Sequence, residues 1–249
     1  MSGGLAILNR ELKAYFFSPL GYVVLTLMLL VNGGVFWIIM SFLNDPRAPG
    51  GSPGAPLEYF FGQTLYFWLV LLVMTPALTM RLLSEERRSG SIEPLMTAPV
   101  SEAQVVMGKF MAALVFYVVL WLPTVTYAGI VAYHSDIDWG PVGAGYLGIL
   151  GIGSLFLAVG LFASSLSRNQ LIAAIIAFAI LMVLFSFGLL ENLFNSEATR
   201  EVLGYMNLWR HMEDFSKGIV DTRALVYYLS ATTLFLFLSS KALEANKWR

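Results

Sequence analysis

The amino-acid sequence predicts an all-α membrane protein with six transmembrane helices, and three observations lead to that prediction. The chain has 249 residues, of which 57% are hydrophobic and 12% are charged, whereas about 25% of the residues in an ordinary soluble domain are charged. The mean hydropathy is +0.72. Six apolar stretches approach or exceed the roughly 20 residues that a helix needs to cross the hydrocarbon core of a bilayer.

The six expected spans contain no Asp, Glu, Lys, Arg or His residue. In chain order they are Leu20–Leu43, Tyr59–Met80, Phe110–Tyr133, Val142–Ser165, Leu171–Leu190 and Ala224–Ser240. The sixth is the shortest, and its ends are the least sharply defined by the pattern. The connections leave no room for a separate globular domain, so we expect residues 1–249 to form a single transmembrane domain.

The same composition excludes several classes of function. The chain has no cysteine and only two histidines, His134 and His211, which excludes disulfides and thiolate metal sites and leaves little material for a histidine metal cluster. A net charge of −1 does not fit a nucleic-acid-binding protein. Spans without ionisable groups do not suit an ion-driven transporter or an intramembrane hydrolase. We therefore expect no catalytic residue and no metal site in this chain.

The distribution of Lys and Arg predicts the orientation. If both termini are cytoplasmic, ten of the 15 Lys and Arg residues lie on the cytoplasmic side and five on the outer side. Cytoplasmic loops of membrane proteins carry the excess of basic residues. We therefore expect a multi-pass protein with both termini in the cytoplasm.

Residues 1–19 predict an amphipathic helix that lies in the cytoplasmic membrane interface. Arg10, Glu11 and Lys13 provide its polar side, and four apolar residues recur at helical spacing: Leu5, Leu8, Leu12 and Tyr15. A full-length span follows without a small-residue cleavage site, so the segment does not read as a cleavable signal. A frayed polar tail is the alternative.

The loop Arg81–Lys109 is the most structured polar stretch of the sequence. We expect the second span to continue as a helix to Gly90, which is a C-cap residue by type. Ser91 then begins a short helix that ends before Pro99, and Ser101 caps the helix that leads into the third span. A short helix held between two projecting helices could receive a push from a soluble partner. The alternative is a charged, solvated loop.

The segment Glu191–Arg223 lies on the outer side in this topology. Its apolar residues recur at helical spacing and include Tyr205, Trp209 and Phe215. Two interpretations stay open. The segment is either a re-entrant or interfacial helical element, with its aromatic residues at the depth of the lipid headgroups, or an extracellular loop that carries a surface helix. His211 belongs to the same segment.

Glycines and prolines mark packing sites and kinks in the spans. The fourth span contains six glycines, which permit close helix packing either within the subunit or at a dimer contact: Gly143, Gly145, Gly148, Gly151, Gly153 and Gly160. Pro76 and Pro123 predict kinks in the second and third spans.

Four polar residues fall inside the apolar stretches: Asn32, Thr75, Thr79 and Ser186. In a membrane such groups need hydrogen-bond partners because no water is available there. We interpret them as interhelical hydrogen-bond partners rather than as ligands of a substrate.

Two stretches and the tail resemble a known family of membrane proteins. NRELKAYFFSPLGYV at Asn9–Val23 and EERRSGSIEPLMTAPVSEAQVVMGKF at Glu85–Phe110 resemble the first helix and the cytoplasmic loop of ABC-2 type transporter permeases. The tail His211–Arg249 is similar to the subgroup of gliding-motility-associated permeases. The nitrous-oxide-reductase maturation permease is a more distant likeness. The resemblance covers nearly the whole chain and specifies no cargo.

The resemblance implies a six-span permease of a bacterial inner membrane with both termini inside. It implies that two permease subunits pair, as a homodimer or with a paralogue, and that two copies of a cytoplasmic P-loop ATPase bind them. ATP and magnesium would belong to that ATPase, since this chain has no GxxxxGK[ST] sequence. A periplasmic accessory protein and membrane lipids are further expected partners, and nucleic acid is not.

The resemblance also implies which residues meet the ATPase. The coupling helix would be formed by Ser91, Ile92, Glu93, Pro94, Leu95, Met96, Thr97 and Ala98. Glu86 and Glu93 would contact basic groups on the ATPase, and Gly90 would form a tight turn. The expected function is to couple ATP hydrolysis in the partner to export or to a mechanical task in the cell envelope. A passive channel and a scaffold for a periplasmic partner are the alternatives.

Overall fold

The computed structural model describes residues 3–43, 55–90, 100–191 and 196–245, and within these ranges the chain forms helices and no β-strand. Six helical runs are long and apolar enough to cross a membrane: Gly21–Leu43, Pro56–Ser89, Glu102–His134, Trp139–Leu166, Gln170–Leu190 and Thr222–Ala245. The predicted class, an all-α protein with six candidate spans, is therefore confirmed.

Four of the runs each correspond to a single helix, and the other two are divided into several helical elements. The single helices are α2 (Pro19–Leu43), α9 (Trp139–Leu166), α10 (Gln170–Leu190) and α13 (Thr222–Ala245). The second run consists of α3 (Ala55–Glu58), the π-helix η1 (Tyr59–Gln63), α4 (Leu65–Thr79) and α5 (Ser84–Ser89). The third consists of α7 (Glu102–Trp121), the 3₁₀ turn η2 (Leu122–Thr124) and α8 (Val125–His134). Outside the runs lie α1 (Gly3–Phe16), α11 (Glu197–Tyr205) and α12 (Leu208–Ser216).

The helix α9 is the centre of the bundle and contacts α13, α10, α12, α4 and α7. Its glycines make this packing possible. A Cβ atom on Gly145 would lie 2.8 Å from the Phe61 ring, and one on Gly151 would lie 2.6 Å from the Tyr228 ring. Five of the six glycines meet side chains of this chain in this way, whereas a Cβ on Gly143 would meet nothing within 4 Å. The glycines therefore serve packing within the subunit.

The second span is broken where the sequence predicts one helix from residue 59 to residue 80. Gly62 has a φ of 148°, a conformation that favours glycine, and the side chain of Met212 occupies the space beside it. Trp68 fixes the break by donating its Nε1 hydrogen to the Gly62 carbonyl at 3.3 Å. The continuous helix was wrong because α12 packs into this turn.

A second break separates α4 from α5, where the sequence predicts an uninterrupted helix to Gly90. The N–H groups of Leu83 and Ser84 donate to the hydroxyl of Ser164 on α9, at 3.0 and 3.1 Å. The same hydroxyl donates to the Met80 carbonyl at 3.0 Å. The serine thus satisfies backbone groups that a continuous helix would pair itself. The predicted cap is confirmed, because Gly90 is left-handed at φ 74°.

The two prolines behave differently. Pro123 lies in the 3₁₀ turn that divides α7 from α8, as the predicted kink requires. Pro76 lies inside α4, and the helix continues past it to Thr79. The break in this span comes one turn later, where Ser164 replaces the backbone hydrogen bonds.

The polar residues inside the spans bond to their own helices, which corrects the interhelical interpretation. Thr75 donates to the Leu71 carbonyl at 2.8 Å and Thr79 to the Thr75 carbonyl at 2.7 Å. Asn32 and Ser186 likewise donate to carbonyls four residues earlier. An accepting carbonyl one turn back is always within reach in a helix, so these groups need no partner on a neighbour.

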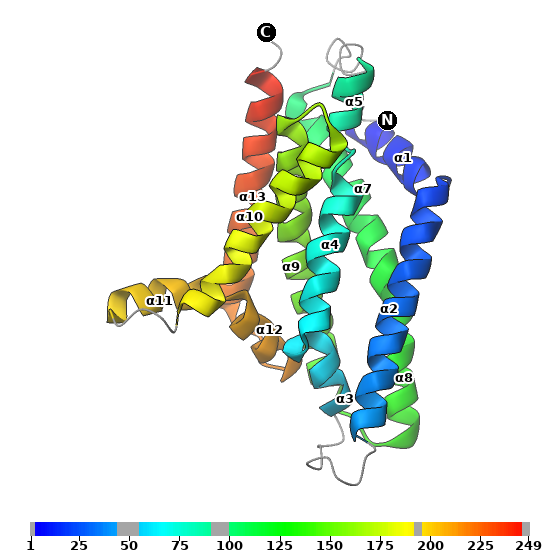
Figure 1. Ribbon diagram of the computed structural model, residues 1–249, viewed down its shortest axis with the longest axis vertical. Helices are drawn as coiled ribbons and strands as arrows, with labels where there is room; N and C mark the ends of the chain where they lie inside the picture. The colour runs from blue at the N-terminus through cyan, green and yellow to red at the C-terminus, as the bar shows by residue number, and fades with distance from the viewer. Residues whose placement is uncertain (1–2, 44–54, 91–99, 192–195, 246–249) are drawn as a thin grey trace.

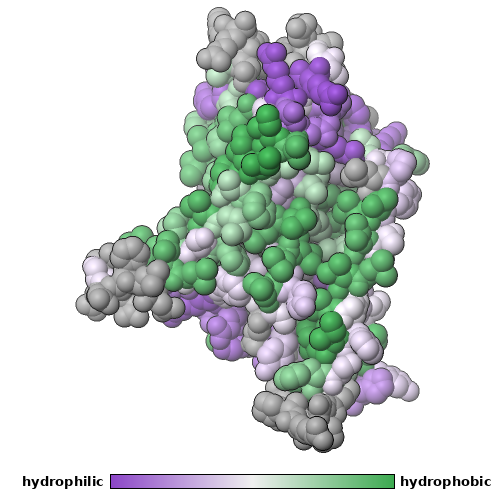
Figure 2. Space-filling view, viewed as in Figure 1, coloured by the Kyte–Doolittle hydropathy of each residue, from purple (hydrophilic) through white to green (hydrophobic). Residues whose placement is uncertain are grey.

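The surface and the chain ends fit a membrane protein. Large apolar side chains are exposed on α2, α10 and α13, with Trp37 and Leu229 each 71% exposed, and Figure 2 shows hydrophobic residues over the middle of the molecule and hydrophilic ones at the end that carries α5. Both termini lie at that end (Figure 1). The last helix runs from Thr222 to Ala245, longer than the predicted Ala224–Ser240. Its surplus includes the polar residues beyond Ser240, which the apolar pattern excludes.

Candidate functional site

Four charged side chains form a cluster where α1, α5 and α7 meet, close to the chain termini. Lys109 on α7 places its Nζ atom 2.9 Å from Glu11 Oε1 and 3.0 Å from Glu86 Oε1. Arg10 pairs with Glu11 at 2.7 Å and also with Glu86. The Lys109 side chain is 1% exposed, and those of Glu11 and Glu86 are 13% and 12% exposed. We call these four residues the charge cluster.

Close approach of two helices brings the charge cluster together. A Cβ atom on Gly108 would lie 3.0 Å from the Gly4 carbonyl oxygen and 3.1 Å from the Ile7 side chain, so α7 and α1 touch at this glycine. The next residue, Lys109, is thereby placed beside Glu11. Tyr15 stacks on Phe116 at 4.8 Å and donates to the Leu78 carbonyl at 2.8 Å. The helix α1 is therefore held by both α7 and α4.

The charge cluster is electrostatically self-contained. Burial by itself would raise the pKa of Glu11, but Lys109 and Arg10 outweigh it, and the pKa is lowered. Burial would lower the pKa of Arg10, and the pairing with Glu11 and Glu86 reverses the shift, so that it is raised. Glu11 and Arg10 are therefore charged at neutral pH. A buried lysine is tolerated in the fold because two carboxylates surround it.

The start of α7 confirms the predicted cap. Ser101 accepts the Gln104 N–H on its hydroxyl at 3.3 Å, and Gln104 accepts the Ser101 N–H on its side-chain oxygen at 3.1 Å. This reciprocal capping box satisfies two N–H groups at the first turn. It fixes the point at which the chain enters α7 after the segment that carries the expected coupling helix.

The structure describes some of the residues expected to contact an ATPase, and others lie outside the described ranges. Ser91–Ala98, with Glu93 and Pro94, lies outside the described residues. Glu86 has partners within the chain through Oε1, while its Oε2 is buried without a hydrogen-bond partner. A contact between Glu86 and an ATPase stays a prediction. Arg10 and Glu11 join the cluster, whereas Lys13 is exposed and forms none of the ion pairs of the cluster.

Sequence reasoning missed Lys109 as the centre of the cluster. It stands at the start of a long apolar run, Phe110–Leu122. A lysine this close to a buried run requires anionic partners, and that signal was available. Which carboxylates supply them depends on the packing of α1 against α7, which the sequence does not state.

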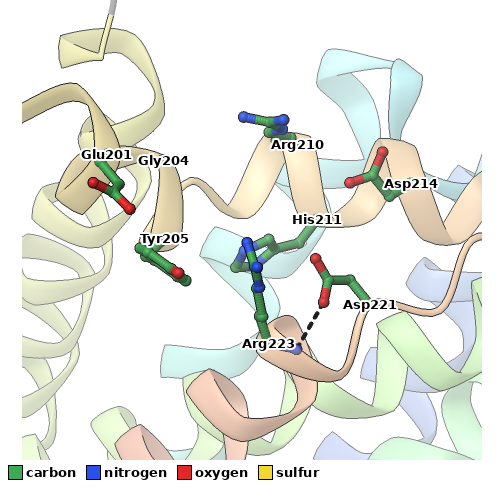
Figure 3. A pocket seen from close by; sticks show the side chains of 8 residues that line it. All are labelled: Glu201, Gly204, Tyr205, Arg210, His211, Asp214, Asp221 and Arg223. Carbon is green, nitrogen blue, oxygen red and sulfur yellow. Dashed lines mark hydrogen bonds between the residues drawn. The ribbon is translucent and has the colours of Figure 1, made fainter. Parts of the chain in front are cut away.

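The opposite side of the bundle carries a polar pocket of about 190 Å³ between α11, α12 and the start of α13. Figure 3 shows its side chains. The titratable residues that line it come from all three elements: Glu201, Arg210, His211, Asp214, Asp221 and Arg223. The guanidinium carbon of Arg223 lies 5.7 Å from the centre of the Tyr205 ring. We call this site the polar pocket.

Between α10 and α13, the described part of the segment Glu191–Arg223 forms the two helices α11 and α12, and its predicted residues separate into two groups. Tyr205 and His211 line the polar pocket. Trp209 and Phe215 turn inward instead: Trp209 packs on Trp68 and Phe185 at 5.0 and 4.9 Å, and Phe215 is 1% exposed. Their place at the depth of the lipid headgroups stays a prediction, as does a re-entrant path for the segment.

His211 is the buried member of the polar pocket. Its ring packs edge-on against Tyr228 at 5.5 Å and Tyr227 at 5.7 Å. Burial lowers its pKa from 6.5 to about 4; Asp221 opposes this shift and Arg210 adds to it. The imidazole is therefore neutral at physiological pH. Among the described residues, no group of three or more His, Asp or Glu side chains is placed to hold a metal ion.

Comparison with known families gives one match. The sequence profile of the ABC-2 family transporter proteins matches residues 5–247, which is nearly the whole chain. No curated protein matches the chain. The match does not distinguish the gliding-motility-associated permeases or the nitrous-oxide-reductase maturation permease from the rest of the family, and so gives neither resemblance support.

Proposed function

The chain belongs to the ABC-2 transporter family, and from that premise we propose that it couples ATP hydrolysis by a separate cytoplasmic ATPase to export or to a mechanical task in the cell envelope. Membership makes it a membrane transport component rather than a catalytic subunit, and implies an ABC ATPase as its partner. A cell-envelope task is favoured by the likeness of His211–Arg249 to gliding-motility permeases. Passive conduction and scaffolding are the functions that the tests below would have to exclude.

The observation that carries the proposal is the charge cluster. It joins α5, which precedes residues 91–99, to α7, which follows them, and to α1. The first turn of α1 also lies against the chain just before α7, because a Cβ on Gly3 would meet the side chain of Val100. A force applied by an ATPase to Ser91–Ala98 would therefore act on three helices together.

The route from the charge cluster into the bundle passes through α9. On one side, Ser164 of α9 binds the backbone between α4 and α5. On the other, Tyr117 of α7 donates to the Ile149 carbonyl of α9 at 3.0 Å. Displacement of α5 or α7 would therefore move α9 and the helices packed on it. We propose that this is how ATP binding in the partner reaches the spans.

The exposed apolar faces of α2 and α10 support pairing with a second permease subunit, since patches of this kind face either lipid or protein. Leu30 on α2 and Leu171 on α10 are each 68% exposed. We propose a complex of two permease subunits and two ATPase subunits in the inner membrane of a bacterium, with both termini cytoplasmic. A periplasmic accessory protein would join on the opposite side.

The first test is purification of the tagged full-length chain from its native host, with crosslinking before solubilisation and mass spectrometry of stoichiometric partners. We expect a P-loop ATPase. A crosslinked chain without any ATPase would favour the scaffold, and current through purified protein in a bilayer without ATP would favour the channel.

The second test measures coupling in the reconstituted complex. The double change Gly90→Ala and Glu93→Gln should lower transport-coupled ATP turnover while the helical circular dichroism stays unchanged. Glu244→Gln is the matched control, because Glu244 forms only an exposed pair with Lys241 on α13. Equal turnover in the double variant and the control would overturn the coupling assignment.

A further inference from the structure

The polar pocket plays no part in the proposed coupling, and the charged side chains that line it indicate a binding site. We propose that it binds the zwitterionic headgroup of a membrane phospholipid, with the phosphate held by Arg210 and Arg223 and an ammonium group held by Asp214 and Asp221. The class is that of phosphoethanolamine lipids. The pocket would hold one such lipid at the edge of the bundle. This inference is independent of the coupling mechanism.

The charged side chains of the polar pocket have no oppositely charged partner in the described part of the chain. In the described part of the molecule, none of the five charged side chains that line the pocket forms an ion pair, although six pairs exist elsewhere. Asp221 accepts only the Arg223 backbone N–H, at 2.8 Å. The Arg223 guanidinium lies over the Tyr205 ring, 5.7 Å from its centre. Neither contact neutralises a charge, so the two guanidinium groups and the carboxylate of Asp214 remain available to an outside molecule.

The sign and arrangement of the charges favour a zwitterionic ligand. Figure 3 shows Asp214 and Asp221 at one side of the pocket, Glu201 and Tyr205 at the other, and Arg210, His211 and Arg223 between them. A purely anionic ligand would meet three carboxylates, and a purely cationic one would meet two guanidinium groups. A molecule that carries both charges a few atoms apart satisfies both sets.

The neutral imidazole of His211 sharpens this selectivity. Because its pKa is about 4, it adds no positive charge to the pocket at neutral pH, and the phosphate must be balanced by Arg210 and Arg223. Both arginines are exposed and are free to turn toward a bound phosphate. A guanidinium group forms two parallel hydrogen bonds to phosphate oxygens, which a lysine cannot do.

The size and the surroundings of the polar pocket favour a lipid over a soluble zwitterion. The pocket volume of about 190 Å³ is smaller than the roughly 300–1,000 Å³ of sites for whole drug-sized ligands, so it suits a headgroup alone. The helices that border it expose large apolar side chains, on which acyl chains would lie: Leu189 on α10, Val202 on α11, and Val226 and Leu229 on α13. Figure 1 shows α11 projecting from the end of α10, away from the bundle.

The test uses the purified full-length chain and native mass spectrometry in a mixture of equal parts phosphatidylethanolamine, phosphatidylcholine and phosphatidylglycerol. We expect the chain to retain phosphatidylethanolamine about tenfold more than phosphatidylglycerol, the order expected when a charged hydrogen bond is gained. Phosphatidylcholine should bind less than phosphatidylethanolamine, because its ammonium group has no N–H to donate. Equal or stronger retention of phosphatidylglycerol would overturn the proposal.

Two pairs of changes separate the two halves of the site. Arg210→Gln with Arg223→Gln should lower retention of all three lipids about tenfold. Asp214→Asn with Asp221→Asn should abolish only the preference for phosphatidylethanolamine, and asparagine can still accept the Arg223 N–H that Asp221 accepts now. The matched control is Glu213→Gln with Lys217→Gln. These two residues pair with each other at the C-terminal end of α12 and do not line the pocket.

A soluble competitor distinguishes a lipid from a free zwitterion. Glycerophosphoethanolamine should fail to displace the lipid at concentrations up to a thousandfold above it, an order of magnitude set by the loss of apolar contact. Displacement at equimolar concentration would show that the pocket serves a soluble ligand, and would overturn the lipid assignment. Retention that is unchanged in both pairs of variants would show that lipids bind elsewhere on the apolar surface.

Discussion

The charge cluster and the polar pocket use the same kinds of residue in opposite ways. Each joins three helices, and each contains two cationic side chains among carboxylates. In the charge cluster every cation has two carboxylate partners. In the polar pocket, as far as the structure describes it, no charge is paired. The contrast shows that side-chain composition does not distinguish a closed structural joint from an open binding site; pairing does.

Burial explains why the two regions differ. Lys109 is 1% exposed, and an ammonium group removed from water costs several kcal/mol unless carboxylates compensate it. Arg210, Asp221 and Arg223 are exposed, so water solvates them and nothing in the fold forces them to pair. The first arrangement is dictated by stability, and the second leaves its charges available for other molecules.

The largest loss of stability should come from Lys109→Met, which tests whether the charge cluster depends on its buried lysine. The change removes the buried cation and leaves Glu11 and Glu86 paired only with the half-exposed Arg10, and should lower the free energy of unfolding by roughly 3 to 5 kcal/mol. Unfolding in mixed micelles, followed by circular dichroism, measures it. Adding Glu86→Gln should restore part of the loss. Lys241→Met, which breaks an exposed pair, should cost less than about 1 kcal/mol, and equal losses in the two variants would contradict the buried role of Lys109.

The next effect is a pH dependence confined to the polar pocket. The pKa of His211 is lowered from 6.5 to about 4, so the stability that comes from keeping it neutral is complete above pH 6.5 and is lost as the pH falls toward 4, up to roughly 3 kcal/mol. Hydrogen exchange of α12, corrected for the intrinsic pH effect, should accelerate over this window. The pKa of Glu11 is lowered from 4.5, so its contribution is lost only below pH 4.5, and α1 should keep its protection above that value.

His211→Phe is the control for that pH dependence. Phenylalanine keeps the ring contacts with Tyr227 and Tyr228 and removes the titrating group. Exchange of α12 in this variant should no longer change between pH 6.5 and 4.5. If it accelerates as in the unmodified chain, another group is responsible and the assignment to His211 fails.

A smaller effect is expected from Ser164→Ala, at the end of the bundle where the charge cluster lies. The change removes the acceptor of two buried N–H groups, those of Leu83 and Ser84, and should cost about 2 kcal/mol. Ser154→Ala, on the same helix, removes a bond to its own Gly151 carbonyl and a long contact of 3.4 Å with the Thr232 hydroxyl on α13, and should cost about 1 kcal/mol or less. Similar unfolding midpoints for the two alanine variants would show that the break between α4 and α5 does not depend on Ser164.

The smallest effect compares one arginine from each region. Arg10→Gln removes two carboxylate contacts and should cost about 1 kcal/mol, because Arg10 is half exposed. Arg210→Gln removes no ion pair and should change stability by less than about 0.5 kcal/mol. Thermal unfolding in one detergent measures both. A larger loss of stability in Arg210→Gln than in Arg10→Gln would contradict the difference in charge pairing between the two regions.

The sequence predicts the helices well because a helix that crosses the bilayer must be apolar over a nearly fixed length. It also predicts local caps, such as Ser101 with Gln104 and the left-handed Gly90, since these depend on neighbouring residues. It fails at the two breaks of the second span. There the cause is a side chain from elsewhere in the chain: Met212 at Gly62, and Ser164 at Leu83 and Ser84.

The same difference between local and long-range interactions applies to the functional residues. Arg10 and Glu11 were singled out from the amphipathic pattern of residues 1–19, and Glu86 from the family resemblance. Their mutual pairing through Lys109 depends on the contact of Gly108 with α1. The polar pocket was foreseen only as a segment that contains Tyr205 and His211. Arg210 and Asp214 come from α12, and Asp221 and Arg223 lie at the start of α13. Only the packing of α11, α12 and α13 places them around one space.

The glycines of α9 have a consequence for how the subunit can move. Aromatic side chains from four other elements are seated at Gly145, Gly148, Gly151 and Gly153, and Thr79 is seated at Gly160. Those positions span 15 residues, or about 22 Å of helix, and fix both the height and the rotation of α9 relative to its neighbours. Sliding α9 by even one residue would force several rings against Cβ atoms or carbonyls. We therefore expect the bundle around α9 to tilt as one rigid body, so that a passage for cargo opens along its outer boundary and not through its interior.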